Sequence, residues 1–166
     1  MRVAAIGECM IELSELDDGR LSRTYGGDTF NTAVYLARLG VAVDYVTALG
    51  DDPFSEEMLA GWRREGVGTA HVLRLAGRLP GLYLIRRDAR GERSFFYWRS
   101  AAAARELFEL PETPSVIEAL GDYDLLYFSG ITLSLYGEAG QVLKRGHELP
   151  GVLAVLERRL LKLVEG

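Results

Sequence analysis

The chain has 166 residues, of which 48% are hydrophobic and 26% charged, values typical of a soluble globular domain with a sizeable core. Its formal net charge of −5 argues against nucleic acid or an anionic membrane surface as partner, because both need clustered Lys and Arg. The single cysteine, Cys9, excludes an internal disulfide and indicates a reducing compartment. No apolar run approaches the ~20 residues of a membrane span, and the first residues do not resemble a secretory signal. We expect a cytoplasmic protein.

Apolar runs and turn residues predict strands and helices in alternation along the chain. A short apolar run ended by glycine indicates a buried strand, two alternating runs around a turn signal indicate a hairpin, and apolar residues every three or four positions indicate a helix. In chain order we predict a strand over 2–6, a hairpin of 10–14 and 21–25, a helix over 28–39 capped by Asp28, a strand over 43–49, a helix over 53–64, a hairpin of 81–87 and 93–98, a helix over 115–120, a strand over 124–129, a loop over 136–150 and an amphipathic helix over 152–164.

Strand–helix units interleaved with two hairpins are typical of an α/β fold. We expect a parallel sheet flanked by helices, with a separate small antiparallel sheet.

The segment GGDTFNTA at 26–33 closes the first hairpin and opens a helix. Its two glycines permit backbone conformations that a Cβ forbids, and a helix N-terminus offers unpaired N–H donors. Asp28 and Asn31 add a carboxylate and an amide one turn apart, a set suited to several hydroxyls of a polyol. The segment is neither a Walker loop nor a dinucleotide-binding GxGxxG. An ordinary Gly-Gly turn with Asp28 as helix cap is the alternative interpretation.

The wider spacing of this segment resembles the first signature of the ribokinase-like (PfkB) carbohydrate kinases. That signature combines a glycine pair, an asparagine, a small residue and two later glycines, here Gly26, Gly27, Asn31, Ala33, Gly40 and Gly50. The Gly-Gly-Asp-Thr version is characteristic of the ketodeoxygluconate kinases. The similarity continues through IGECMIELS at 6–14, YVTALGDD at 45–52, RLPGLY at 78–83, GER at 91–93, FYWR at 96–99 and FSGI at 128–131.

The resemblance runs to about Tyr136 and covers only the first half of a family member. It implies a truncated ribokinase-like fold, in which a parallel sheet flanked by helices carries a small antiparallel β lid. Residues 1–166 would then form a single partial domain, with lid strands inserted at approximately 10–25 and 81–99. We expect a homo-oligomer through the lid or the exposed sheet edge, since a sheet cut midway leaves an open edge.

A sugar acid needs a cation in its site, and Arg99 follows a predicted lid strand. Arginine binds carboxylates bidentately, while Tyr83 and Tyr97 offer flat rings and hydroxyls. The resemblance implies substrate contacts at Gly26, Gly27, Asp28, Asn31, Tyr83, Tyr97 and Arg99, with Glu8 as a weaker candidate. In the alternative interpretation, residues 95–98 are an ordinary apolar strand and Arg99 is its solvated end.

The family resemblance implies ATP-dependent phosphorylation of 2-keto-3-deoxygluconate, with Mg²⁺. Family members carry the catalytic aspartate in a late Gly-Ala-Gly-Asp loop, and the similar string EAGQ at 138–141 lacks the carboxylate. We therefore expect neither a catalytic aspartate nor a metal site in this chain, and assign ATP and Mg²⁺ to full-length members. Two alternatives remain: a catalytically incomplete sugar-acid-binding or oligomerisation fragment, and a related kinase for ribose, fructose or a nucleoside. Arg99 disfavours the second, because neutral sugars need no carboxylate contact.

Overall fold

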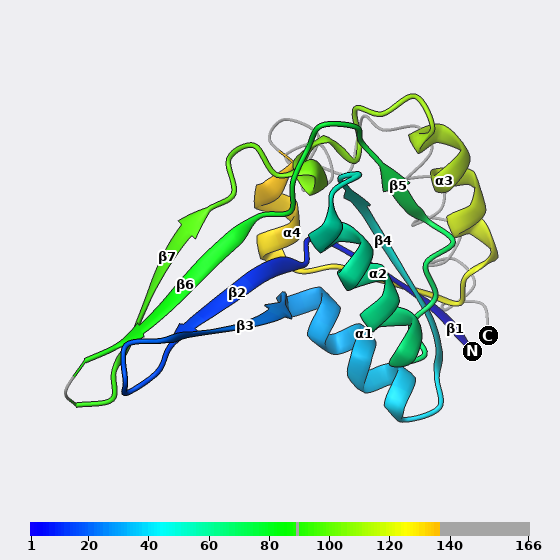
Figure 1. Cartoon of the computed structure of the whole chain (residues 1–166). Coiled ribbons are helices and arrows are strands. Elements are labelled where there is room, and N and C mark those ends of the chain that lie inside the picture. The colour runs from blue at the N-terminus through cyan, green and yellow to red at the C-terminus, as the bar shows by residue number, and fades with distance from the viewer. Residues whose placement is uncertain (89, 137–166) are drawn as a thin grey trace.

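The computed structural model describes residues 1–88 and 90–136, which form an α/β body and a projecting β lid (Figure 1). The body contains a four-stranded parallel sheet in the order β5-β4-β1-β8. Its strands are β1 (Arg2–Ile6), β4 (Ala42–Leu49), β5 (Val72–Arg74) and β8 (Leu125–Tyr127). This is the predicted fold class.

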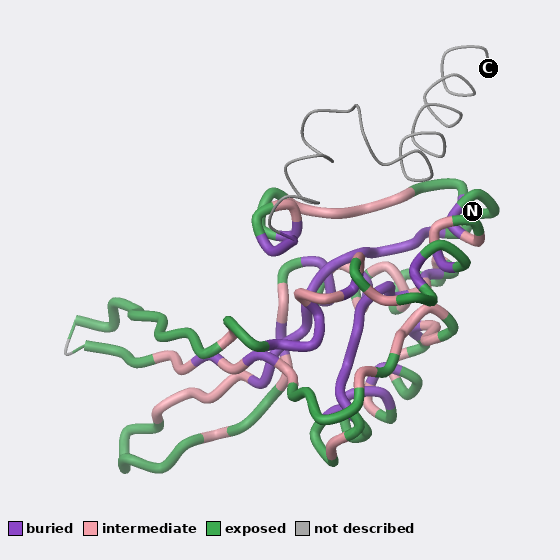
Figure 2. The backbone as a smooth tube through the Cα atoms, turned by 90° about the horizontal axis from the view of Figure 1, so that it is seen from above, coloured by how far each residue is buried: buried purple, intermediate pink, exposed green. Residues whose placement is uncertain are grey.

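Helices cover both faces of the body sheet, which explains why its strands are nearly continuous apolar runs. On one face α1 (Asp28–Arg38) and α2 (Pro53–Arg64) pack against β1 and β4, with Trp62 in contact with Phe30 and Tyr45. The other face packs against η1 (Ala103–Glu106), α3 (Thr113–Ala119), η2 (Leu120–Asp122) and α4 (Gly130–Leu135). The central strands are accordingly buried along most of their length (Figure 2).

The lid is a second sheet built from the two predicted hairpins, β2 (Met10–Glu15) with β3 (Leu21–Gly26) and β6 (Leu82–Arg87) with β7 (Arg93–Trp98). Each hairpin is antiparallel, as expected. The hairpins join through a parallel pairing of β2 with β6, in the order β3-β2-β6-β7. The lid is therefore a mixed sheet rather than a wholly antiparallel one, because β2 and β6 both leave the body in the same direction (Figure 1).

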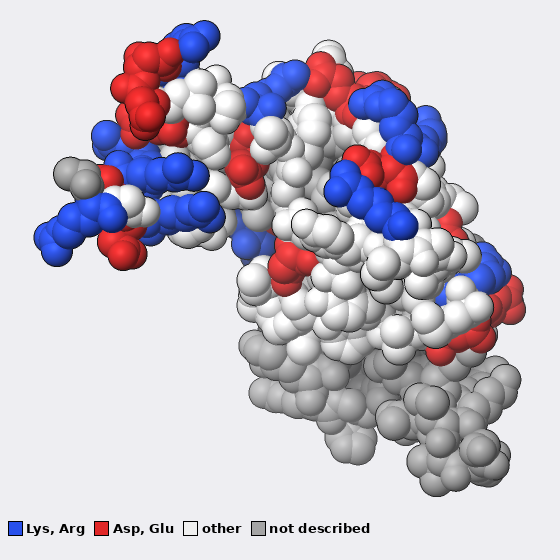
Figure 3. Space-filling model, turned by 90° about the horizontal axis from the view of Figure 1, so that it is seen from below, with Lys and Arg blue, Asp and Glu red and all other residues white. Residues whose placement is uncertain are grey.

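Ion pairs tie the outer elements together, and charged side chains of both signs stand out on the lid in Figure 3. Within the lid, Arg86 of β6 pairs with Glu15 of β2. Between lid and body, Glu57 of α2 accepts hydrogen bonds from Arg23 Nη2 and Tyr25 Oη, each at 2.6 Å. The lid is thus fastened to the outer surface of α2 at the base of β3.

Several helices and strands begin or end at other residues than predicted, for identifiable reasons. The helix cap is Gly27 rather than Asp28, whose carboxylate instead accepts a hydrogen bond from the Thr29 amide at 2.8 Å. The predicted strand over 124–129 is shortened to β8, because Ser129 caps α4 by accepting from the Thr132 amide. The short elements β5, η1, η2 and α4 were not predicted. The helix predicted over 152–164 and nearly all of the loop over 136–150 lie outside the described residues.

No helix in the described part of the chain combines the length and the apolar character that crossing a membrane requires.

Candidate functional site

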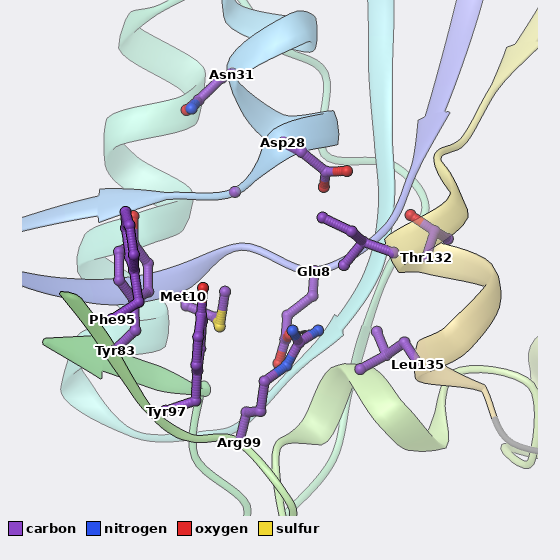
Figure 4. Close-up of a pocket in the computed structure, with 12 residues that line it drawn as sticks. Glu8, Met10, Asp28, Asn31, Tyr83, Phe95, Tyr97, Arg99, Thr132 and Leu135 are labelled. Atoms are coloured by element: carbon purple, nitrogen blue, oxygen red, sulfur yellow. Dashed lines mark ion pairs between the residues drawn. The ribbon is translucent and has the colours of Figure 1, made fainter. Parts of the chain in front are cut away.

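A cleft of about 270 Å³ lies where the lid, the start of α1 and α4 meet. Residues from five separate segments converge on it (Figure 4). They are Glu8, Met10, Gly27, Asp28, Asn31, Tyr83, Phe95, Tyr97, Arg99, Ile131, Thr132 and Leu135. Every predicted contact residue except Gly26 is among them. Gly26 lies beside the cleft at the end of β3, where an added Cβ would come within 2.7 Å of Tyr83 Oη.

Aromatic rings from the lid form one wall of the cleft. Strand alternation places Tyr83 of β6 beside Phe95 and Tyr97 of β7 on the same face of the lid. The Tyr83 and Tyr97 ring centroids are 5.9 Å apart, and Phe95 stacks on Tyr97 at 6.4 Å. The Tyr83 hydroxyl donates to Glu12, and burial together with this bond raises the pKa of Tyr83. The ring of Tyr83 therefore faces the cleft while its hydroxyl is engaged within the lid.

A buried ion pair forms the floor of the cleft. Arg99 Nη2 lies 2.5 Å from Glu8 Oε2, and the Glu8 side chain is only 3% exposed. Burial outweighs the attraction of Arg99 and raises the pKa of Glu8 from 4.5 to about 7. Neither Glu8 oxygen has a well-directed hydrogen bond within the described residues, and neither does Arg99 Nε. Arg99 is thus not a solvated strand end, and it keeps donor capacity for a further partner.

The start of α1 approaches the floor closely enough to require glycine. A Cβ on Gly27 would lie 2.2 Å from the main-chain oxygen of Glu8. Thr29 anchors the helix start through a 3.0 Å hydrogen bond with Tyr45 Oη in the core. Asp28 points into the cleft and Asn31 lies at its outer edge (Figure 4). One turn of helix therefore brings a carboxylate and an amide to the cleft, as predicted from the sequence.

Sequence reasoning missed Met10, Phe95 and the cleft residues on the α4 side. Ile131, Thr132 and Leu135 close the cleft opposite the lid, and Thr132 Oγ1 donates to the Ile6 carbonyl at 3.2 Å. The available signal was Ser129, a favoured N-cap residue two positions after the end of β8. Within residues 1–88 and 90–136, no group of three or more His, Cys, Asp or Glu side chains gathers as a metal-ligand set would.

The family model described as pfkB family carbohydrate kinase matches residues 1–151. The chain belongs to the pfkB family of carbohydrate kinases. It is 50% identical over 143 residues to the 2-dehydro-3-deoxygluconokinase of Dickeya dadantii, covering 84% of this chain and 46% of that protein. It is 49% identical over 138 residues to the Escherichia coli K12 protein of the same name, covering 81% of this chain and 44% of that protein.

A solved structure of a 2-dehydro-3-deoxygluconokinase from Thermotoga maritima superposes on this pfkB family chain with a TM-score of 0.71 at 29% identity. The match covers 87% of this chain and 46% of that one. The family resemblance and the fold class predicted from the sequence are therefore confirmed. The chain spans about half the length of the curated relatives it matches.

Proposed function

We propose that this chain forms the sugar-acid-binding part of a 2-dehydro-3-deoxygluconokinase, an enzyme that phosphorylates 2-keto-3-deoxygluconate at its terminal hydroxyl. The observation that carries the proposal is Arg99, whose guanidinium lies at the floor of a small cleft and whose Nε has no hydrogen-bond partner among residues 1–88 and 90–136. A guanidinium in a water-poor site binds a carboxylate more strongly than a neutral hydroxyl. The names of the 45–50% identical relatives favour the same substrate.

The other cleft residues are assigned by the groups they present. Asp28 and Asn31 would bind sugar hydroxyls, with Gly27 permitting the ligand to approach the start of α1. Tyr83 and Tyr97 would pack against the carbon chain of the sugar acid. A cleft of about 270 Å³ suits a small metabolite rather than a nucleotide.

We assign ATP and Mg²⁺ to the whole enzyme, because the family consists of carbohydrate kinases. The described residues carry only the sugar-acid part, so no step of phosphoryl transfer is assigned to them.

We also propose a cytoplasmic location, because Cys9 is buried and forms no disulfide. Self-association through the lid is proposed from Phe96 and Trp98, which are 45% and 60% exposed.

The test is a calorimetric titration of the purified chain with 2-keto-3-deoxygluconate. We expect saturable binding that Arg99→Ala weakens at least tenfold, since a charge-assisted contact is lost. Arg38→Ala is the matched control, because Arg38 pairs with Glu65 between α1 and α2, away from the cleft. Equal affinity in the wild-type chain and Arg99→Ala would contradict the assignment. A coupled ADP-release assay on the same samples separates binding from turnover.

A further inference from the structure

Glu8 is the most deeply buried carboxylate of the cleft, and charges of both signs surround it. Its residue is 4% exposed, and it follows β1 at the centre of the body sheet. The groups that face it from the neighbouring elements are Arg99 after β7, Arg105 in η1, Asp28 at the start of α1, Tyr136 after α4 and the adjacent Cys9. Among the described residues, Arg99 alone is in direct ion-pair contact with it.

The charge balance of this cluster changes when an anion enters. In the free chain, Glu8 and Arg99 form a pair whose charges cancel, with Arg105 and Asp28 further away. A ligand carboxylate that pairs with Arg99 would bring a second negative charge to a guanidinium that already has a partner. Two carboxylates cannot share one buried site at low cost while both are ionised. Water cannot screen the repulsion effectively, because the Glu8 side chain is 3% exposed.

We propose that Glu8 takes up one proton from the solvent when a carboxylate ligand pairs with Arg99, so that sugar-acid binding is coupled to protonation. The proton moves from the buffer to a Glu8 carboxyl oxygen, and no bond of the ligand is made or broken. The inference rests on the proposed function. Glu8 would then set the pH range in which the sugar acid binds. This role explains why an acidic side chain lies in a site for an anion.

Two further features of the structure favour this coupling. Apart from the ion pair with Arg99, neither Glu8 oxygen has a hydrogen-bond donor among the described residues, so the ionised form depends on Arg99. Arg99 Nε likewise has no hydrogen-bond partner in the described part of the chain, so the guanidinium can turn a second edge towards a ligand while Glu8 becomes neutral. The pKa of Glu8, near 7 in the free chain, means that protonation at neutral pH costs little.

The experiment is calorimetry of the chain with 2-keto-3-deoxygluconate at pH 6, 7, 8 and 9. At pH 8 it is repeated in phosphate and in Tris, two buffers with different ionisation enthalpies. We expect uptake approaching one proton per bound ligand at pH 8 and little uptake at pH 6, where Glu8 is already protonated. The Kd should be nearly constant below pH 7 and rise above it, with a slope approaching tenfold per pH unit. Fructose, which carries no carboxylate, should bind without proton uptake.

Glu8→Gln supplies the matched variant, because an amide has the shape of the protonated carboxyl and cannot ionise. It should bind the sugar acid without proton uptake, and at pH 8 at least as tightly as the wild-type chain. Glu12→Gln, whose carboxylate bonds Tyr83 inside the lid, should keep the uptake. Binding of the sugar acid without proton uptake overturns the inference alone, as does uptake that persists in Glu8→Gln. Absence of any sugar-acid binding contradicts the proposed function and the inference with it. The two-buffer comparison on the wild-type chain decides the question even where a variant does not fold.

Discussion

Arg99 and Glu8 form an ion pair at the floor of the cleft, with 2.5 Å between guanidinium and carboxylate. Arg99 follows β7 of the lid, whereas Glu8 follows β1 of the body. This contact joins the lid to the body at the centre of the candidate site. A buried pair whose hydrogen bonds are incomplete is a costly arrangement for stability alone. Its position on the cleft floor therefore fits a role in ligand binding.

Replacing Glu8 by glutamine should change how stability depends on pH. The folded-state pKa of Glu8 is raised to about 7, so the wild-type chain loses stability as pH rises from 4.5 through 7. This rise in the pKa of Glu8 corresponds to a loss on the order of 3 kcal/mol in the free energy of unfolding. Glu8→Gln lacks this component and should gain stability relative to the wild-type chain at pH 8 but not at pH 4.5.

Urea unfolding at pH 4.5, 6 and 8 measures this difference directly. Glu118→Gln, on an exposed position of α3, serves as the control and should show no such trend. A stability difference between Glu8→Gln and wild type that stays constant with pH would show that Glu8 titrates normally.

Gly27→Ala should damage both the fold and the site. The added Cβ would lie 2.2 Å from the Glu8 main-chain oxygen, so the start of α1 must move away from the cleft floor. We expect a loss of about 1–3 kcal/mol in the free energy of unfolding and weaker sugar-acid binding. Gly130→Ala at the start of α4 is the control, because nothing lies within 4 Å of its added Cβ. If the two variants unfold at the same urea concentration, the close approach at Gly27 is not a constraint.

The sequence predicted the body well because each element there carries its own local signal. Strand β1 and helix α2 have the bounds predicted for them, 2–6 and 53–64. Strand β5 has three residues, Val72–Arg74, and exists by pairing with β4, so no pattern within it could reveal it. Helix α4 has six residues, too few for a visible helical period.

Many of the residues that line the cleft could be named from the sequence, whereas the contacts between them could not. The fold brings Glu8 and every contact residue implied by the motif resemblance except Gly26 to the cleft, whereas the resemblance implied no contact at Met10, Phe95 or the residues of α4. The ion pair between Arg99 and Glu8 forms because the end of the lid lies against the end of β1. These two segments are far apart in the sequence, and neither motif shows that they meet. The same holds for Tyr83, whose hydroxyl is directed to Glu12 by the parallel pairing of β2 with β6.

Glu57→Gln should loosen the lid. Glu57 on α2 accepts from both Arg23 and Tyr25, so its charge holds the base of β3 against the body. We expect faster hydrogen exchange in β2 and β3 and a few-fold loss of sugar-acid affinity, because the lid carries the aromatic wall of the cleft. Glu65→Gln, which breaks the pair with Arg38 between α1 and α2, should leave lid exchange unchanged. Equal exchange in the two variants would show that this contact does not position the lid.

The central claim is that Arg99 selects a carboxylate, and the affinity ratio between 2-keto-3-deoxygluconate and fructose tests it most directly. Fructose is a six-carbon 2-keto sugar with a hydroxymethyl group in place of the carboxylate and a C3 hydroxyl that the sugar acid lacks. The change in the affinity ratio on replacing Arg99 therefore measures the contribution of the negative charge. Calorimetry at pH 6.5 on the wild-type chain should give at least tenfold tighter binding of the sugar acid, and Arg99→Met should remove most of that preference. Equal affinity for both sugars in the wild-type chain, or an unchanged preference in Arg99→Met, would contradict the account.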